Sequence, residues 1–337
     1  INFFSTFPNV TFYLLEQPLP GCDFGDIVFR KYRGGKKCLE TRKWVPFTPA
    51  NNSKLSNNKT YMTLKLRDVF SNFMMTSRYQ DGHVDLFIGL ECINASFGAL
   101  QKKRGRFKDS VYYIFDWAPD RYANPLINSA YLWLDKMASY YCDYTWNITH
   151  TIGDARIERL GYDKDRISPQ LVVPYCYDYH PNNILPDDQI DPNLILYSGK
   201  HLHKLGLDGR YEITGFIADE AEVLKLQKSA GIAVAPYPII KGSRKPYGDV
   251  IKIRMYFACG LPVVSTPVPP VTREIRQEKL GIVTDDDSPK ALADAVSVYL
   301  ADPEKLFATR KRVARKASKN NWHDNYTHAL KKMGYSL

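Results

Sequence analysis

The sequence lacks a run of apolar residues that could cross a membrane. A membrane-spanning helix needs about 20 consecutive apolar residues, and no stretch of the 337-residue chain approaches this length. The first residues also lack the basic cluster and the long apolar core of a signal peptide. We therefore expect a cytoplasmic protein, with peripheral contact at the inner face of a membrane as an additional hypothesis.

The chain also lacks the cysteine patterns of metal sites and disulfide frameworks. Its six cysteines form no Cys-x-x-Cys pair and none of the spacings typical of zinc sites. The sequence therefore predicts no metal site. The scattered positions favour reduced thiols, and apolar neighbours predict burial for four of them: Cys92, Cys142, Cys176 and Cys259.

Acidic residues are too few to balance the basic ones. The chain has 46 Lys and Arg against 36 Asp and Glu, which gives a net charge of +10. This charge favours acidic partners: a sugar nucleotide, a phospholipid-linked acceptor, an anionic membrane or a nucleic acid. Residues 305–319 are rich in Lys and Arg, and they fit a membrane-facing helix or, preferably, a solvated helix face. No nucleic-acid-binding motif is present.

Strand-like and helix-like segments alternate from residue 84 onwards, which predicts parallel, doubly wound α/β sheets. The expected strands are 84–89, 110–116, 143–148, 170–174, 194–199, 211–216, 231–237 and 261–265. The expected helices are 97–103, 125–141, 154–160, 221–229, 250–259, 289–300, 303–319 and 322–333. A polar, proline-bearing segment at 179–192 is typical of a linker.

The first 80 residues are harder to interpret. Strands are expected at 3–7 and 26–31, a loop at 44–59 and a helix at 61–73. No glycine-rich loop follows the first predicted strand.

The most informative stretch is 247–266, which predicts a loop, a helix, a turn and a buried strand. Gly260 is expected to end the helix, and Pro262 prevents it from continuing. A helix N-terminus presents unpaired N–H groups and partial positive charge, so it suits a phosphate. Lys252 adds a full positive charge in the first turn, which a bound anion would help to explain. The alternative is a solvated lysine on an ordinary helix.

This stretch resembles the donor-site segment of family 4-type glycosyltransferases of the GT-B fold. In a common subgroup the segment reads Gly-Asp-Pro-x-Lys-x-x-Glu-Tyr-x-Ala-x-Gly-x-Pro-Val-Val. The matching residues are Gly248, Asp249, Lys252, Tyr256, Ala258, Gly260, Pro262, Val263 and Val264. Val250 replaces the subgroup's proline, and Tyr247 and Met255 stand where many relatives carry glutamates that orient the donor sugar and hold the ribose.

The resemblance implies two Rossmann-like domains facing across a cleft. The expected domains are 1–178 on the acceptor side, a linker at 179–192, a nucleotide-sugar domain at 193–320, and a last helix at 321–337 that crosses back. It also implies transfer from a nucleotide diphosphate sugar, a UDP- or GDP-sugar, to a glycan or lipid-linked acceptor, as in polysaccharide biosynthesis. Family kinship implies retention of configuration without a metal or other cofactor.

Several residues take donor-binding roles under this resemblance. Lys200 and Lys204 would contact the donor diphosphate from a basic loop that begins at Gly199, with a solvated loop as the alternative. Lys200 and Lys252 would stabilise the departing diphosphate. The remaining donor-binding residues are expected to be Phe216, Ile217, Tyr247, Gly248, Asp249, Val250 and Ile251.

Asp116 is the candidate on the acceptor side. It follows an apolar strand and begins a loop with a second acid, an arginine and aromatic residues. It would orient an acceptor hydroxyl or act as a base. A helix N-cap or an Asp–Arg surface pair is an equal alternative. His150 and His180 are isolated in sequence and are interpreted as structural.

Two other classes of function stay open. A GT-B-fold epimerase or phosphorylase would use the same crevice without this acceptor chemistry. A non-catalytic protein binding nucleic acid or anionic lipid would depend on the +10 charge and would lose affinity steeply with salt.

Overall fold

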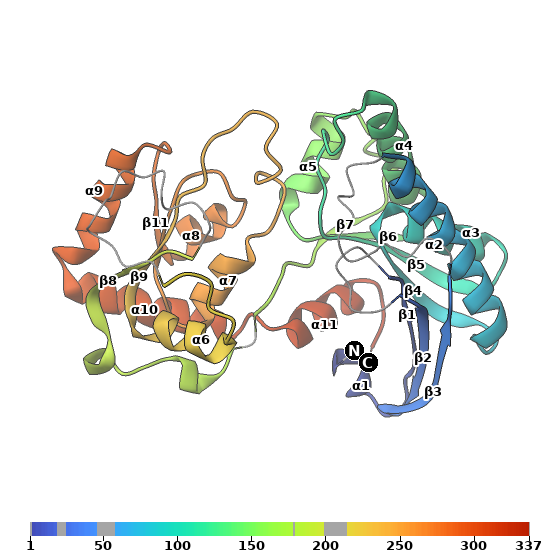
Figure 1. Cartoon of the computed structure of the whole chain (residues 1–337), viewed down its shortest axis with the longest axis horizontal. Helices are drawn as coiled ribbons and strands as arrows, with labels where there is room; N and C mark the ends of the chain where they lie inside the picture. The colour runs from blue at the N-terminus through green and yellow to red at the C-terminus, as the bar shows by residue number, and fades with distance from the viewer. Residues whose placement is uncertain (1, 19–24, 46–57, 178, 199–213, 337) are drawn as a thin grey trace. The chain divides into compact units, whose positions relative to one another are not determined.

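The computed structural model describes residues 2–18, 25–45, 58–177, 179–198 and 214–336 (Figure 1). The chain forms two compact units. Unit 1 comprises residues 1–147, 152–172 and 329–337, and unit 2 comprises 148–151 and 173–328. None of the described helices is long and apolar enough to cross a membrane.

Unit 1 contains a parallel sheet of four strands in the order β4-β5-β6-β7. The strands are β4 (Val84–Leu90), β5 (Phe107–Ile114), β6 (Tyr144–Asn147) and β7 (Gln170–Val172). The connecting helices are α3 (Glu91–Lys103), α4 (Pro125–Tyr141) and α5 (His150–Glu158), whose first two residues are counted in unit 2. Because the strands are parallel, their carboxyl ends lie at one edge, where α3 begins directly after β4.

A second, antiparallel sheet in unit 1 is formed by β1 (Thr11–Glu16), β2 (Ile27–Arg33) and β3 (Lys36–Lys43). Helix α2 (Asn58–Tyr79) packs on it through buried Met75. The sequence did not predict β1 or β3, and β3 is hard to recognise because five of its eight residues are charged. Glu40 on β3 pairs with Arg30, Lys37 and Arg42, and these cations lower the pKa of Glu40 to about 2.

The strand expected at residues 3–7 was wrong. Residues Asn2–Ser5 form a short helix, α1. The ring of Phe3 lies against those of Phe4 and Phe7 in edge contacts of 5.0 and 5.2 Å between centroids. The aromatic residues therefore cluster with one another instead of alternating across a strand.

A buried polar network fastens the helices of unit 1 to its parallel sheet. Arg156 on α5 and Asp135 on α4 form an ion pair at 2.7 Å, and both side chains are fully buried. The hydroxyl of Tyr112 on β5 donates to Asp135 at 2.7 Å, and Arg156 donates to the side-chain oxygen of Asn147 on β6. The network therefore joins two helices and two strands at one point.

Unit 2 contains a second parallel sheet in the order β11-β10-β9-β8. The strands are β8 (Asp191–Leu196), β9 (Ala230–Ala235), β10 (Val263–Ser265) and β11 (Gly281–Val283). The helices are α6 (Glu220–Ser229), α7 (Ile251–Ala258), α8 (Thr272–Glu278), α9 (Pro289–Leu300), α10 (Pro303–Ala317) and α11 (Trp322–Lys332), with single 3-10 turns at Pro181–Asn183 and Asp187–Gln189.

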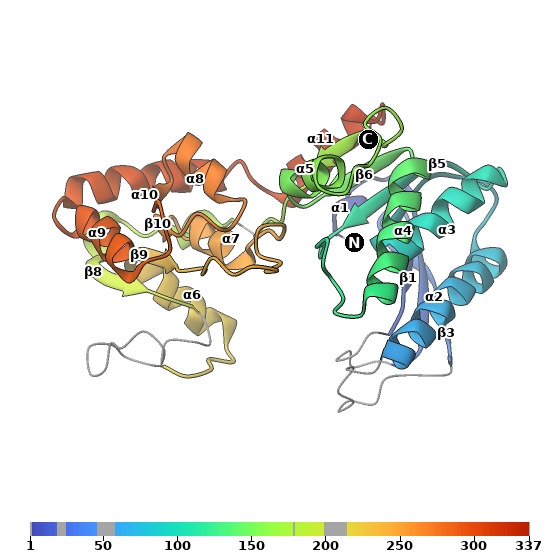
Figure 2. The same cartoon turned by 90° about the horizontal axis from the view of Figure 1, so that it is seen from above.

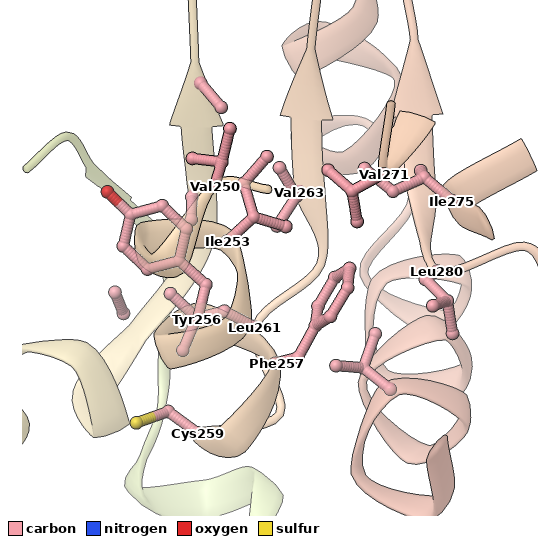
Figure 3. Packing of buried hydrophobic residues seen from close by; sticks show 14 residues of the cluster. Val250, Ile253, Tyr256, Phe257, Cys259, Leu261, Val263, Val271, Ile275 and Leu280 are labelled. Atoms are coloured by element: carbon pink, nitrogen blue, oxygen red, sulfur yellow. The ribbon is translucent and has the colours of Figure 1, made fainter. Parts of the chain in front are cut away.

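The two faces of this sheet carry different helices (Figure 2). On one face, Ile253 and Phe257 of α7 pack with Val263, Ile275 and Leu280 (Figure 3). On the other face, the alternate strand residues pack against α9 and the start of α10. Burial on both faces explains why these strands are continuous apolar runs in the sequence.

Most predicted elements from residue 84 onwards are confirmed. Helices α4 and α9 have the predicted bounds, and α7 ends before Gly260, whose φ of +70° favours glycine. Strand β11 (three residues) and helix α8 (seven residues) were not predicted. Residues 211–213 of the strand expected at 211–216 lie outside the described residues, and Thr214, Gly215 and Phe216 are not in a strand.

We expect Asp135→Ala to destabilise the protein by about 3–5 kcal/mol, because it leaves the Arg156 guanidinium buried without its carboxylate. Asp294→Ala is the matched control, because it removes an exposed partner of Lys290 and should cost less than about 1 kcal/mol. Urea unfolding measures both variants. Equal losses of stability would contradict the role given to the buried network.

Candidate functional site

The loop before α7 is held by a buried carboxylate. The side chain of Asp249 is 1% exposed and pairs with Arg254 at 3.2 Å. It also accepts hydrogen bonds from the backbone N–H groups of Tyr175 and Val250, each at 3.0 Å. Burial raises the pKa of Asp249, and Arg254 opposes that rise. Asp249, expected to bind the donor, thus has its carboxylate turned into the protein, where it fixes the loop.

Arg254 extends this network to the next helix. Its guanidinium donates to Glu274 on α8 at 2.6 Å, while its Nε donates to Asp249. Arg254 is almost fully buried, and the pKa of its guanidinium is raised because the two carboxylates outweigh the effect of burial. The loop, α7 and α8 are therefore joined through one side chain.

The first turn of α7 is open to a ligand. Val250 stands at the N-cap position, and no side chain caps the helix there. The first N–H groups of a helix have no partner within it, so those at Ile251 and Lys252 face the preceding loop. Lys252 is exposed, and its pKa is lowered first by partial desolvation and then by the charge of Lys245. A positive, uncapped helix start is suited to an anion.

Neighbouring groups complete this edge of unit 2. The hydroxyl of Tyr256 accepts a hydrogen bond from the backbone N–H of Ser198 at 2.9 Å, which ties the exit of β8 to α7. The ring of Tyr237 lies 5.4 Å from the ammonium of Lys245. Tyr247 and Gly248 form a turn in which both backbone N–H groups donate to the carbonyl of Arg244.

The other predicted donor residues are either outside the described residues or exposed to solvent to different degrees. Gly199, Lys200 and Lys204 lie outside the described residues. Phe216 is 94% exposed. Ile217 is half-buried.

Asp116 lies in a polar cluster of unit 1. Its carboxylate is 3.3 Å from Arg121, whose guanidinium is 3.8 Å from the carboxylate of Glu91. Burial raises the pKa of Glu91, and Arg121 opposes that rise. Glu91 also has φ of +64°, a strained conformation for a non-glycine residue. The sequence analysis missed Glu91, although an acid directly after a parallel strand was a usable signal.

A small cavity of about 80 Å³ opens beside this cluster. Its wall includes Glu91, Arg121 and the hydroxyl-bearing Tyr131. The Tyr131 hydroxyl is buried and has no hydrogen-bond partner among the described residues. A carboxylate, a guanidinium and a hydroxyl together can bind a group that both donates and accepts hydrogen bonds.

A larger cavity, of about 470 Å³, lies in unit 2. Its charged wall residues are Arg273 and Arg276 of α8, beside His150. The sequence analysis interpreted His150 as structural and missed both arginines, because α8 was not predicted.

No cluster of three His, Cys, Asp or Glu side chains that could hold a metal occurs in the described ranges. The four cysteines predicted to be buried thiols are buried and free, which confirms that expectation.

A family model matches part of unit 2, whereas solved structures match most of the chain. Residues 186–302, about a third of the chain, match the family model for glycosyl transferases group 1. The matched segment contains α7, its loop and α8. A search of curated proteins found no match.

Solved structures resemble the chain over most of its length. Sucrose-phosphate synthase from Thermosynechococcus elongatus has a TM-score of 0.65 at 15% identity, covering 94% of this chain and 87% of its own. The chain has the GT-B fold. A Rickettsia africae glycosyltransferase (TM-score 0.58, 13% identity, 84% and 82% covered) and Anabaena HepE in complex with UDP-glucose (0.55, 17%, 80% and 82%) also have similar structures.

The contrast between Asp249 and Lys252 gives a stability prediction. Asp249→Ala leaves Arg254 short of one carboxylate and should cost about 3–5 kcal/mol. Lys252→Ala should leave stability at pH 7 unchanged or raise it, because a lowered lysine pKa means that folding disfavours the charged form below that pKa. Thermal unfolding measures both. A larger loss for Lys252→Ala would show that the lysine is structural.

Proposed function

We propose that the protein is a glycosyltransferase that moves a sugar from a nucleotide diphosphate sugar to a hydroxyl group of a glycan or lipid-linked acceptor. The carrying observation is the uncapped start of α7, with Lys252 in its first turn. The family match across this segment and the UDP-glucose complex of HepE support a UDP-sugar as donor, with a GDP-sugar as the alternative.

The donor diphosphate would lie against the backbone N–H groups of Ile251 and Lys252. In the reaction the bond between the sugar C1 and the diphosphate oxygen breaks, and a bond from C1 to the acceptor oxygen forms. Negative charge then develops on the leaving oxygen. Fixed N–H dipoles and the Lys252 ammonium would stabilise that charge without reorganisation, and Lys200 would act with them.

The loop that presents these groups must stay fixed while the charge develops. Asp249 and Arg254 supply that rigidity, because both are buried and joined to each other. Tyr247, Gly248, Val250 and Ile251 would thus contact the donor through a positioned backbone. We propose retention of configuration without a metal, in line with the resemblance of the donor segment.

The acceptor would bind in unit 1 at the cluster around Asp116. Carboxylates of Asp116 and Glu91 can accept from a sugar hydroxyl, while Arg121 fixes both of them. Asp116 is the more exposed of the two acids, with 56% of its side chain accessible against 30% for Glu91. Asp116 would therefore touch the acceptor, and Glu91 would position it through Arg121.

A ligand that binds only the folded state raises the melting temperature. We expect a shift with one family among UDP-, GDP-, ADP- and CMP-sugars at millimolar concentration, and a much smaller shift for Lys252→Ala. Lys290→Ala, which removes an exposed lysine of α9, is the matched control and should keep the shift. No shift with any of these sugar nucleotides would contradict the proposal and favour a non-catalytic binding protein.

The pH dependence of donor binding tests the role of Lys252 separately. The pKa of Lys252 is lowered, so its positive charge should be lost at lower pH than that of an ordinary lysine, and affinity for UDP should fall there. Lys252→Arg keeps its charge over about pH 7–10 and should lack this decline, while any titration of UDP itself affects both proteins equally. Identical pH profiles would remove Lys252 from the diphosphate site.

A further inference from the structure

The cavity of about 470 Å³ in unit 2 has a wall with cations and no carboxylate. Arg273, Arg276 and His150 supply basic groups, and Gln277 adds an amide. The apolar part is formed by prolines 246, 267, 269 and 270. Ligand sites in proteins commonly occupy about 300–1,000 Å³, so the cavity has room for a small organic anion.

The basic and the acidic side chains of α8 lie on different sides of the helix. Residues 273, 276 and 277 follow the spacing of one helix face and line the cavity. The acids Glu274 and Glu278 are turned to other helices, where Glu274 pairs with Arg254 at 2.6 Å and with Lys316 at 3.2 Å. Glu278 pairs with Lys316 as well. The carboxylates of α8 are therefore occupied away from the arginines beside the cavity.

Neither Arg273 nor Arg276 pairs with a carboxylate among the described residues. Arg273 forms no ion pair or side-chain hydrogen bond within the described residues. Arg276 makes one long hydrogen bond, at 3.4 Å, to the carbonyl of Thr284. The carboxylates of Asp286 and Asp287, which follow Thr284 in the chain, accept hydrogen bonds from the backbone N–H groups of Ser288 and Ile239. Two guanidinium groups with free donors are well matched to phosphate or carboxylate oxygens.

The cavity shares a wall with the candidate donor loop. Pro246 lines it and lies two residues before Gly248. The hydroxyl of Thr151 donates to the carbonyl of Pro246 at 2.9 Å, and that of Thr149 donates to the carbonyl of Tyr247 at 2.7 Å. Residues 148–151 belong to unit 2, so these bonds hold one side of the cavity to the loop.

We infer that this cavity binds an anionic group, a phosphate or a carboxylate, carried by the sugar acceptor, separately from the donor diphosphate. The inference rests on the proposed glycosyl transfer, because the acceptor must reach the donor loop that forms the cavity wall. Arg273 and Arg276 would pair with the anion, and the cavity would hold the sugar residue that carries it. The hydroxyl that receives the transferred sugar would belong to another residue of the acceptor, the one assigned above to the Asp116 cluster.

Isothermal titration with glucose 6-phosphate, glucuronate, glucose and orthophosphate tests this assignment. We expect one of the two anionic sugars to bind at least about tenfold more tightly than both glucose and orthophosphate. We expect the same sugar to lose about tenfold or more in affinity in Arg273→Ala/Arg276→Ala, because the anion would lose its charged hydrogen-bond donors. Which of the two binds identifies phosphate or carboxylate as the group. Arg315→Ala, on the exposed face of α10, removes the same kind of charge and should not change affinity.

Equal affinity of the double variant and the unchanged protein, or equal binding of glucose and both anionic sugars, would overturn the inference. Orthophosphate binding as tight as that of the sugar phosphate would also overturn it, because the cavity would then make no contact with the sugar. The double variant should still respond to its sugar nucleotide. If the unchanged protein itself shows no thermal shift with any sugar nucleotide, that result would instead count against the proposed function.

Discussion

The buried guanidinium of Arg254 is the interaction on which the candidate donor-binding edge of unit 2 depends. It joins Asp249, which fixes the loop before α7, to Glu274, which fixes α8. A buried cation is costly unless carboxylates compensate it. The loop before α7 and helix α8 are therefore held where Asp249 and Glu274 both reach Arg254. The uncapped start of α7 and the cationic face of α8 are both consequences of that arrangement.

Acidic and basic side chains near Arg254 therefore lie in different places. The carboxylate of Asp249 is turned inward, and those of Glu274 and Glu278 pair with Lys316, while Lys252, Arg273 and Arg276 remain available at the surface and in the cavity. Part of the net charge of +10 is therefore concentrated at Lys252, Arg273 and Arg276, which composition alone does not show. Unit 1 differs, because the carboxylates of Glu91 and Asp116 lie close to the Arg121 guanidinium, and Glu91 and Arg121 line its cavity.

The sequence predicted the strongly patterned elements, including the loop, helix and strand of residues 247–266. Helices beginning at Pro125 and Pro289 were found with both ends, since proline, capping residues and apolar spacing agreed. It did not predict α8, whose seven residues are too few to show a clear helical period, and so it missed Arg273 and Arg276. It gave Asp249 a ligand-facing role, because the motif does not reveal that a carboxylate is paired five residues further along with Arg254.

The central claim is that the start of α7 binds the donor diphosphate. A crystal structure of the protein with its bound sugar nucleotide tests it most directly. The account predicts phosphate oxygens within hydrogen-bonding distance of the backbone N–H groups of Ile251 and Lys252, with the Lys252 ammonium beside them, and with the Asp249–Arg254 pair unchanged. A diphosphate bound elsewhere, or one that displaces Asp249 from Arg254, would contradict it.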